Sequence, residues 1–152
     1  MAAAAYAQTR DRSDRYAVGR CGPRSWAEAV VADYFTPGTD EPTWNIVQDD
    51  AGQDVGFFAL SAFDEPETAT IIQIGVLPQH RGQGWAVRLL WAAAGVAHAA
   101  GFRAIMSDVD VENTPMIRAL RAAGHRGDLR PWHVWHHRYP LSEVPGSARD
   151  RA

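Results

Sequence analysis

The chain has 152 residues, of which 46% are hydrophobic and 22% are charged, and its formal net charge is −3. These values are typical of a single globular domain with a sizeable core, and they argue against a disordered chain and against a strongly basic nucleic-acid-binding protein. No stretch approaches the roughly 20 apolar residues of a membrane span, and the single cysteine, Cys21, excludes an internal disulfide and offers nothing for a zinc site. We therefore expect a cytoplasmic protein with no membrane, nucleic-acid or metal partner.

The charge is unevenly distributed along the chain, and every cation is an arginine because the sequence contains no lysine. Residues 25–80 hold ten acidic residues and no arginine, whereas residues 81–152 carry a net charge of +4 and residues 1–24 a net charge of +3. This pattern predicts two half-sites of opposite sign, one for an anionic ligand and one for a cationic ligand. Uneven solvated surface is the alternative.

The N-terminal third mixes short polar and apolar runs. Residues 1–14 show no apolar periodicity and are predicted to be disordered, and residues 15–20 are predicted to form a short strand. Ser25 and Glu28 have the spacing of a capping box, which predicts a helix that begins at Ser25 and stops before Pro37.

Three strands are predicted next. Trp44–Gln48 and Val55–Ala62 flank the turn-forming residues 49–52, which predicts an antiparallel hairpin. An acidic loop at residues 63–67 follows. Thr70–Val76 is β-branched and almost continuously apolar, which is typical of a central strand that is covered on both faces.

A helix is predicted over Trp85–Ala100 because its apolar residues recur at helical spacing, and Gly101 is expected to end it. A strand over Phe102–Val109 follows. A strand, a helix and a second strand in this order imply parallel pairing of the two strands.

Asn113 is predicted to cap the next helix, which Gly124 ends. A turn at residues 127–128 and a last strand at Trp132–Tyr139 complete the order. Together the elements predict a mixed α/β sheet with an N-terminal antiparallel hairpin and a central β-loop-α-β unit. We place one domain at residues 15–140 and a polar C-terminal tail at residues 141–152.

The segment Val76–Ala86 carries the clearest chemical signal, because a strand runs into a loop that holds Gly82 and Gly84 and opens a helix. Such a loop can turn backbone N–H groups inward beside the positive helix end, which makes a cradle for a phosphate or pyrophosphate. A tight turn without a ligand is the alternative. Two other phosphate-binding loops are excluded. The motif G-x-x-x-x-G-K-[ST] needs a lysine, which the sequence lacks, and the motif G-x-G-x-x-G needs a third glycine where Val87 stands.

This loop, Arg81-Gly82-Gln83-Gly84-Trp85-Ala86 after Val76-Leu77-Pro78, resembles the acetyl-CoA-binding motif R/Q-x-x-G-x-G/A of the GCN5-related N-acetyltransferases, the GNAT superfamily. The segment Asn113–His125 resembles the second motif of that family, an asparagine followed by a helix. The resemblance covers residues 69–125. It implies a twisted mixed sheet of the GNAT type, whose central strands splay apart at the acyl-CoA site.

The resemblance also implies the roles of individual residues. Loop amides would bind the pyrophosphate of acetyl-CoA as co-substrate, the end of the preceding strand would pair with its pantetheine arm, and the Asn113 side chain would contact the arm or the thiol. The cofactor-binding residues implied in this way are Gly75, Val76, Leu77, Arg81, Gly82, Gln83, Gly84, Trp85, Ala86 and Asn113. A thioester carbonyl polarised by an N–H near Val76 is set for direct attack by an amine.

Two positions depart from the family pattern. Leu120 stands where many members have a tyrosine that protonates the leaving thiolate, and we expect it to be buried packing. The motif strand offers Gln73 where many members have a glutamate that accepts the amine proton.

Four residues are candidate substitutes for these proton-transfer groups. They are Asp108, Asp110 and Glu112, which lie at the end of the strand after the cofactor helix and alternate onto one face, and Tyr139 on the last strand. A solvated acidic turn is the alternative for the three carboxylates. Aromatic packing accounts for the histidines of the last strand better than a metal site.

We therefore expect an acyltransferase that moves an acetyl or other short acyl group from acyl-CoA to a primary amine of a small molecule or peptide, by direct attack in a ternary complex. One alternative is a donor other than CoA, namely an aminoacyl-tRNA or a carrier-protein thioester. Another is a non-catalytic regulatory domain that binds acyl-CoA. The sequence leaves a homodimer open.

Overall fold

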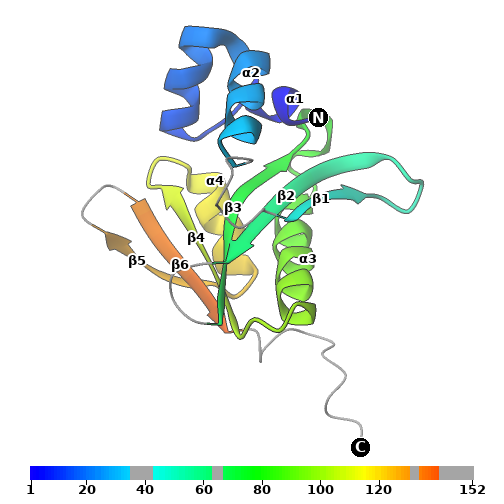
Figure 1. Ribbon diagram of the computed structural model, residues 1–152, viewed down its shortest axis with the longest axis vertical. Helices are drawn as coiled ribbons and strands as arrows, with labels where there is room; N and C mark the ends of the chain where they lie inside the picture. Colours follow the sequence, from blue (N-terminus) through cyan, green and yellow to red (C-terminus); the bar gives the residue numbers. More distant parts are fainter. Residues whose placement is uncertain (35–42, 63–66, 131–133, 141–152) are drawn as a thin grey trace, which may run out of the picture.

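The computed structural model describes residues 1–34, 43–62, 67–130 and 134–140, and within these ranges the side chains other than those of Tyr34, residues 128–130 and residues 134–140. In chain order the elements are α1 (Ala2–Tyr6), α2 (Arg12–Tyr34), β1 (Thr43–Gln48), β2 (Asp54–Ala62), β3 (Thr68–Val76), the short 3-10 helix η1 (Pro78–His80), α3 (Trp85–Ala99), β4 (Ala104–Asp110), α4 (Thr114–Ala122), β5 (Arg126–Arg130) and β6 (Val134–Pro140). The strands form one sheet in the order β1-β2-β3-β4-β6-β5 (Figure 1). None of the helices within these ranges has the length and apolar character needed to cross a membrane.

The sheet is mixed, which confirms the predicted fold class. β1 and β2 form the expected antiparallel hairpin, and β2 pairs antiparallel with β3. The Asp49 side chain closes the hairpin turn, because its Oδ1 accepts the N–H of Ala51 at 3.0 Å and of Gln53 at 2.9 Å. β3 and β4, joined through α3, are parallel.

β3 and β4 splay apart, as expected. Their parallel pairing extends only from Thr68–Thr70 to Ala104–Met106, although both strands continue beyond it. The register between β2 and β3 shifts at Ala59 and Leu60, which leaves Ile72 as an extra residue on β3. Such a bulge bends the strand that carries it. The C-terminal half of β3 therefore has a partner on the β2 side only.

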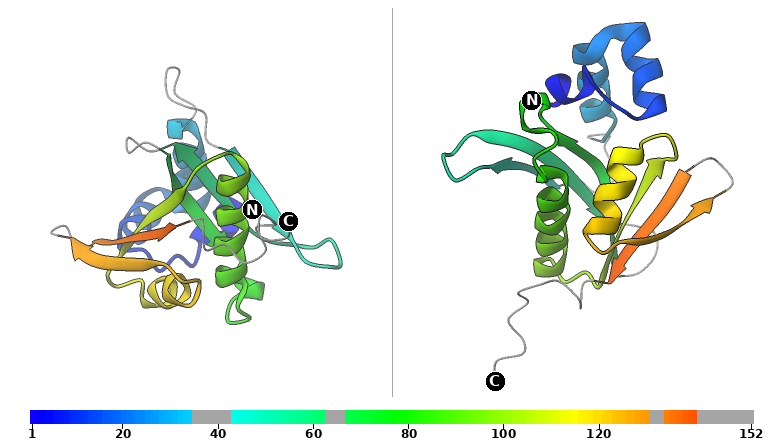
Figure 2. Two further views of the ribbon diagram at one scale, coloured as in Figure 1. Left: turned by 90° about the horizontal axis from the view of Figure 1, so that it is seen from below. Right: turned by 180° about the vertical axis from the view of Figure 1, so that it is seen from behind.

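The helices α3 and α4 contact each other and lie on the same side of the sheet (Figure 2). They enclose one hydrophobic core with β2, β3 and β4, in which Phe58, Leu90, Ile105 and Leu120 are almost completely buried. Both predicted helix ends are confirmed, since Gly101 and Gly124 have φ angles of 92° and 93°. The core thus supports the splayed ends of β3 and β4 from one side.

The expectation of a disordered start at residues 1–14 and a strand at residues 15–20 is wrong. Ala2–Tyr6 form α1 and residues 12–20 belong to the first half of α2, and the Tyr6 side chain is buried against Ala27 and Val30. Alanines favour a helix in residues 2–5. The burial of one large side chain, that of Tyr6, holds this helix in place although the sequence has no apolar periodicity. We call residues 1–34 the helical arm, and Figure 1 shows it packed at one end of the sheet.

The predicted helix start at Ser25 is also wrong. Gly22, with φ 82°, separates two helical halves of α2, and Pro23 follows it at the start of the second half. Proline is favoured in the first turn of a helix, which explains why the second half begins before Ser25. Glu28 binds Arg24, at 3.0 Å, instead of closing a capping box.

The turn predicted at residues 127–128 is wrong as well. Both residues lie inside β5, which pairs antiparallel with β6, so that main-chain pairing overrides their local turn preference. The predicted helix end before Pro37, most of the acidic loop, the first residues of the last predicted strand and the predicted C-terminal tail fall outside the described residues.

Candidate active site

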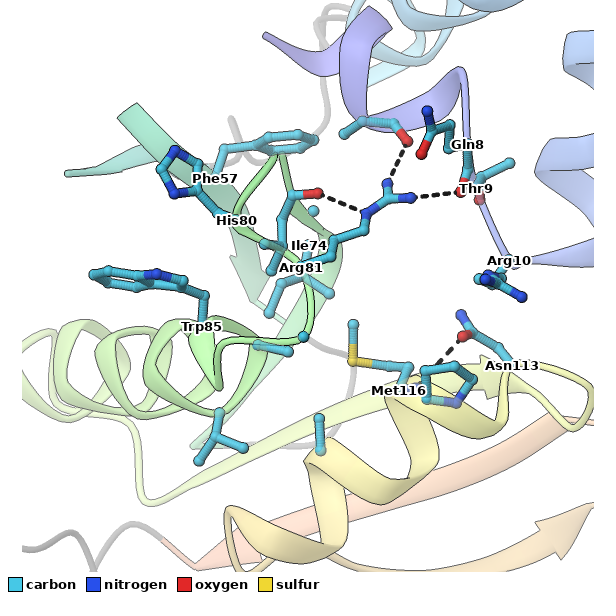
Figure 3. Close-up of a pocket in the computed structure, with 18 of the residues that line it drawn as sticks. Gln8, Thr9, Arg10, Phe57, Ile74, His80, Arg81, Trp85, Asn113 and Met116 are labelled. Atoms are coloured by element: carbon cyan, nitrogen blue, oxygen red, sulfur yellow. Dashed lines mark hydrogen bonds between the residues drawn. The ribbon is translucent and has the colours of Figure 1, made fainter. Parts of the chain in front are cut away.

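A pocket of about 490 Å³, which we call the loop pocket, opens where β3 and β4 separate. Its lining comes mainly from three parts of the chain: the end of β3 with the loop and the start of α3 that follow it, the start of α4, and the helical arm; Phe57 of β2 adds to it. Figure 3 shows Ile74 on one side of this space and Asn113 and Met116 on the other. The Arg81 side chain extends toward Gln8 of the arm, and the Trp85 ring points away from Asn113. Three distant segments therefore meet at the splay.

The loop between β3 and α3 has the backbone geometry of an anion cradle. Gly82 and Gly84 have φ angles of 75° and 82°, and a Cβ at either position would meet no atom within 4 Å. The left-handed backbone, not crowding, is therefore what favours glycine there. Gly84 is the N-cap of α3 and provides no side-chain hydrogen bond. The Val87 N–H donates to the Gly84 carbonyl at 3.1 Å, whereas the N–H groups of Trp85 and Ala86, two residues that line the pocket, have no capping side chain.

Arg81 makes hydrogen bonds that its motif position did not predict. Its guanidinium donates to the carbonyl oxygens of Val76 at 3.1 Å, Gln8 at 2.8 Å and Ala5 at 2.9 Å. Burial, with the nearby Arg10 adding to it, lowers the pKa of Arg81. The Arg81 side chain thus joins the end of β3 to the helical arm.

The charged and titratable side chains on the loop pocket are mostly basic. Arg10, His80 and Arg118 line it together with Arg81, and Asp14 is the one carboxylate among the described lining residues. A basic wall beside free helix amides suits a ligand that carries phosphates.

Eight of the ten expected cofactor-binding residues line this pocket: Gly75, Val76, Arg81, Gly82, Gly84, Trp85, Ala86 and Asn113. The two others have protein partners. The N–H of Leu77 donates to Val55 at 2.9 Å, and the amide of Gln83 donates to the Gln79 carbonyl at 3.0 Å. Asn113 caps α4 as expected, since its Oδ1 accepts the Met116 N–H at 3.4 Å.

A second cavity of about 210 Å³ adjoins the loop pocket, and we call it the acidic cavity. Its charged lining residues within the described chain are Asp11 and Asp14 of the arm and Asp108 of β4. The residues that line both spaces are Thr9, Asp14, Gln73, Ile74, Asn113 and Met116. A basic pocket and an acidic cavity therefore meet at the splay between β3 and β4.

The three acidic candidates from the sequence are not equivalent in the structure. Asp108 lines the acidic cavity. Asp110 and Glu112 instead pair with the arm: Arg12 lies 3.4 Å from Asp110 and 3.9 Å from Glu112, and Arg15 lies 3.0 Å from Glu112. Two of the three carboxylates thus hold the arm against the end of β4.

The remaining sequence candidates have different outcomes. Leu120 is 1% exposed within the core, which confirms the expected burial. Gln73 accepts a hydrogen bond from the Tyr6 hydroxyl. The backbone of Tyr139 pairs with Ile105 in the sheet, but its side chain lies outside the described residues, so its role stays a prediction.

Asp14 is the residue that sequence reasoning missed. Its Oδ1 accepts the indole N–H of Trp26 at 3.0 Å and its Oδ2 accepts the Thr9 hydroxyl at 3.1 Å. Burial raises the pKa of Asp14, and the nearby Asp11 adds to this, against the two hydrogen bonds. The sequence did hold one signal for the start of the helix that carries Asp14, because aspartate is a preferred N-cap residue. Asp11 caps α2 by accepting the N–H of Ser13 and of Asp14.

Comparison with known proteins agrees with this architecture. The model of the acetyltransferase (GNAT) family matches residues 8–125. Among solved structures, the spermidine N-acetyltransferase of Vibrio cholerae in complex with CoA and spermine has a TM-score of 0.61 at 17% identity, over 79% of this chain and 76% of that chain. A comparison with curated protein sequences gives no match.

Two further structures are similar. A phosphinothricin acetyltransferase of Sinorhizobium meliloti in complex with acetyl-CoA has a TM-score of 0.58 at 22% identity, over 78% of this chain and 71% of that chain. A nourseothricin acetyltransferase has a TM-score of 0.56 at 23% identity, over 66% of this chain and 65% of that chain. Identities this low show a shared fold. Since the family model matches more than half of the chain, the protein belongs to the acetyltransferase (GNAT) family.

Proposed function

We propose that the protein is an acyl-CoA-dependent N-acyltransferase that moves an acetyl or other short acyl group to a primary amine by direct attack in a ternary complex. The observation that carries this proposal is the loop pocket, in which uncapped helix amides and basic side chains lie beside the half of β3 that has no partner on the β4 side. The glycine loop supplies N–H groups for the pyrophosphate, and Arg10 and Arg118 supply positive charge.

The free edge of β3 supports binding of the pantetheine arm. From Ile71 to Val76 this strand pairs with β2 on one side only, since its pairing with β4 ends at Thr70, although the Val76 carbonyl already accepts a hydrogen bond from Arg81. Main-chain groups on such an edge can pair with the amides of an extended ligand, as an added strand would. Asn113 lies across the pocket, and its amide NH2 donates to no residue that the structure describes, so that it is free to hold the arm.

The acidic cavity is an argument for an acceptor amine that carries a positive charge in water. None of the described residues of the glycine loop lines it, and its carboxylates would concentrate an ammonium. The acids come from Asp11, Asp14 and Asp108; none of the acidic residues that the structure describes in the stretch 25–80 lines it. The spermidine, nourseothricin and phosphinothricin acetyltransferases among the similar structures favour a small-molecule acceptor over a peptide.

The first experiment is calorimetry with acetyl-CoA and with S-acetyl-pantetheine, which lacks the pyrophosphate. We expect acetyl-CoA to bind at least about 100-fold more tightly, because the cradle binds the pyrophosphate that S-acetyl-pantetheine lacks. This ratio corresponds to about 2.7 kcal/mol. Equal affinities would contradict an anion cradle. No binding of acetyl-CoA would favour a carrier-protein or aminoacyl-tRNA donor.

The second experiment follows the release of the CoA thiol in the presence of primary amines. Binding of acetyl-CoA without turnover of any amine would favour the non-catalytic regulatory domain. For a cationic acceptor, the rate should fall as salt is raised, because exposed charges further apart than about 8 Å are screened at physiological ionic strength. Turnover of anionic or uncharged acceptors only would contradict the assignment of a cationic amine.

A further inference from the structure

The loop pocket and the acidic cavity meet at Asp14, a carboxylate to which the family motifs assign no role. Asp14 lines both spaces, at the start of α2, and Gln73 of β3 and Asn113 of α4 line both as well. We propose that Asp14 binds the ammonium of the acceptor and takes a proton from it as the amine attacks. This inference rests on the proposed function, and it assigns the acceptor half of the site to the helical arm.

The Asp14 carboxylate is held in place but not neutralised. Each of its oxygens accepts one hydrogen bond from an uncharged donor, Trp26 on one side and Thr9 on the other. A carboxylate can accept about four hydrogen bonds, so each oxygen can accept another. No arginine pairs with Asp14 in the described part of the chain, whereas Asp110 and Glu112 nearby both have arginine partners.

The surroundings of Asp14 disfavour its charge unless a cation arrives. Burial raises its pKa and Asp11 adds to the effect. The other charged or titratable side chains that line the two spaces are Tyr6 and Arg10 of the arm, His80 and Arg81 of the loop, Asp108 of β4 and Arg118 of α4. An ammonium held in the acidic cavity would offset the cost of burying the carboxylate, and a raised pKa suits a group that must accept a proton.

Ser107 is a further polar residue at the acidic cavity. It lines the cavity and is 6% exposed, and its hydroxyl has no hydrogen-bond partner among the residues that the structure describes. With a volume of about 210 Å³, the cavity suits a compact amine or the amine end of a longer molecule.

The proposed step balances in protons and bonds. The ammonium gives one proton to the Asp14 carboxylate, and the freed nitrogen lone pair forms the C–N bond with the thioester carbonyl carbon. The C–S bond then breaks, a second nitrogen proton goes to the sulfur, and CoA leaves as the thiol. The third proton stays on the amide nitrogen, and Asp14 returns its proton to solvent.

The test compares wild-type protein with Asp14→Asn, using acetyl-CoA as donor and propylamine, ethanolamine or 1,3-diaminopropane as acceptor. We expect kcat/KM for the amine to fall about 100-fold, within the range for loss of a general base. The KM for acetyl-CoA should stay within about twofold, which separates this proposal from donor binding. Asp14→Glu should recover part of the loss.

The pH profile gives a readout that a purely structural role would not change. Between the pKa of Asp14 and that of the amine, about 10.4 for a lysine-like group, wild-type kcat/KM should be flat, because the enzyme uses the ammonium form. For the Asp14→Asn variant, kcat/KM should instead rise about tenfold per pH unit over this range, because this variant can use only the free amine.

Two controls isolate the carboxylate. Glu28→Gln removes one negative charge from the same helix, at a surface pair with Arg24, and should leave kcat/KM unchanged. Trp26→Phe removes the hydrogen bond to Asp14 while it keeps the carboxylate, and should cost much less activity than Asp14→Asn. If Trp26→Phe lowers kcat/KM as much as Asp14→Asn does, Asp14 has a structural role and the proposal is overturned.

The remaining outcomes separate this proposal from the one on which it rests. If the wild-type protein fails to bind acetyl-CoA, the proposed function itself fails. If it binds acetyl-CoA but acetylates none of the three amines, the assignment of the acidic cavity to a compact amine is overturned while donor binding stands. If it acetylates an amine and Asp14→Asn keeps the wild-type kcat/KM and pH profile, only the role of Asp14 is overturned.

Discussion

The two sides of the site are built in different ways. The crossover unit from β3 to α4, residues 68–122, offers mainly backbone groups: the free edge of β3, the glycine loop and the uncapped start of α3. The helical arm, residues 1–34, offers mainly side chains, with Tyr6, Arg10 and Asp14 all lining the loop pocket. A fixed cradle of backbone groups suits a ligand shared by a family, whereas side chains on a separate unit are free to vary with the second substrate.

The largest effect is expected from the core that supports the crossover unit. Leu120→Ala should destabilise the fold by about 2–5 kcal/mol, because a leucine that is 1% exposed leaves a cavity when it is truncated. Chemical denaturation measures this change. Ile46→Ala is the matched control, since Ile46 is 64% exposed on β1 and should change stability by less than about 0.5 kcal/mol. A Leu120→Ala variant with wild-type stability and a defect in the chemical step alone would contradict the packing role.

The next effect separates the backbone cradle from the arm. Gly84→Asp places a carboxylate at the start of α3, at a backbone φ of 82°, and should weaken acetyl-CoA binding about 100-fold, or about 2.7 kcal/mol. Gly95→Asp puts the same side chain on the exposed face of the same helix and should bind normally. Calorimetry on both variants decides the question, and unchanged affinity in Gly84→Asp would refute the cradle.

Arg81 connects the two sides, and a conservative change can show which side it serves. Arg81→Lys keeps the charge but cannot reproduce a fork that reaches the carbonyls of Ala5, Gln8 and Val76. We expect the arm to open more easily by about 1.5 kcal/mol, seen as faster hydrogen exchange in residues 2–10, with acetyl-CoA affinity changed less. Arg88→Lys on α3 is the control. If acetyl-CoA affinity falls while exchange in the arm stays the same, Arg81 serves the phosphates instead.

The smallest effect is expected at the surface pairs between the arm and β4. Glu112→Gln should cost less than about 1 kcal/mol, because Glu112 and its partners Arg12 and Arg15 are all more than 50% exposed. The kcat should stay near that of the wild-type protein. A large loss of kcat without a loss of stability would restore Glu112 as a catalytic candidate in place of Asp14.

Asp14→Asn also predicts a direction for stability. Because the pKa of Asp14 is raised in the folded state, the fold binds the protonated form better, and this contribution is present below the unfolded value of 3.8 and is lost as pH rises through the folded pKa. At pH 7 the charged carboxylate therefore lowers stability. Asp14→Asn should keep or raise Tm at pH 7, and a lower Tm would indicate that the carboxylate is needed for packing.

The crossover unit could be predicted from the sequence because its signals are local. Glycines at 82 and 84 and the cap at Asn113 each fix the backbone within a few residues, and the structure has them as predicted. The arm could not be predicted, because its stability comes from contacts that are distant along the chain. Tyr6 reaches Gln73, and Arg81 reaches Ala5 and Gln8. No periodicity in residues 1–14 reports such contacts.

The candidate site divides along the same line. Most of the residues that the family resemblance implied for the cofactor line the loop pocket, because their motif is a short local segment of the chain. Asp14 was missed because its importance depends on where α2 places it, between Trp26 and Thr9. Asp110 and Glu112 have the right side chains in the right stretch of sequence, but their arginine partners come from a segment that was expected to be disordered.

The hydrogen bond from the Trp26 indole to Asp14 has a practical consequence. Indole fluorescence responds to the charge of a group that is hydrogen-bonded to its nitrogen. The emission of Trp26 should therefore report whether Asp14 carries a charge or faces an ammonium. Subtracting the emission of Trp26→Phe from that of the wild-type protein isolates this signal from the other five tryptophans. Titrating the amine against that difference spectrum would follow occupancy of the acidic cavity without any turnover of acetyl-CoA.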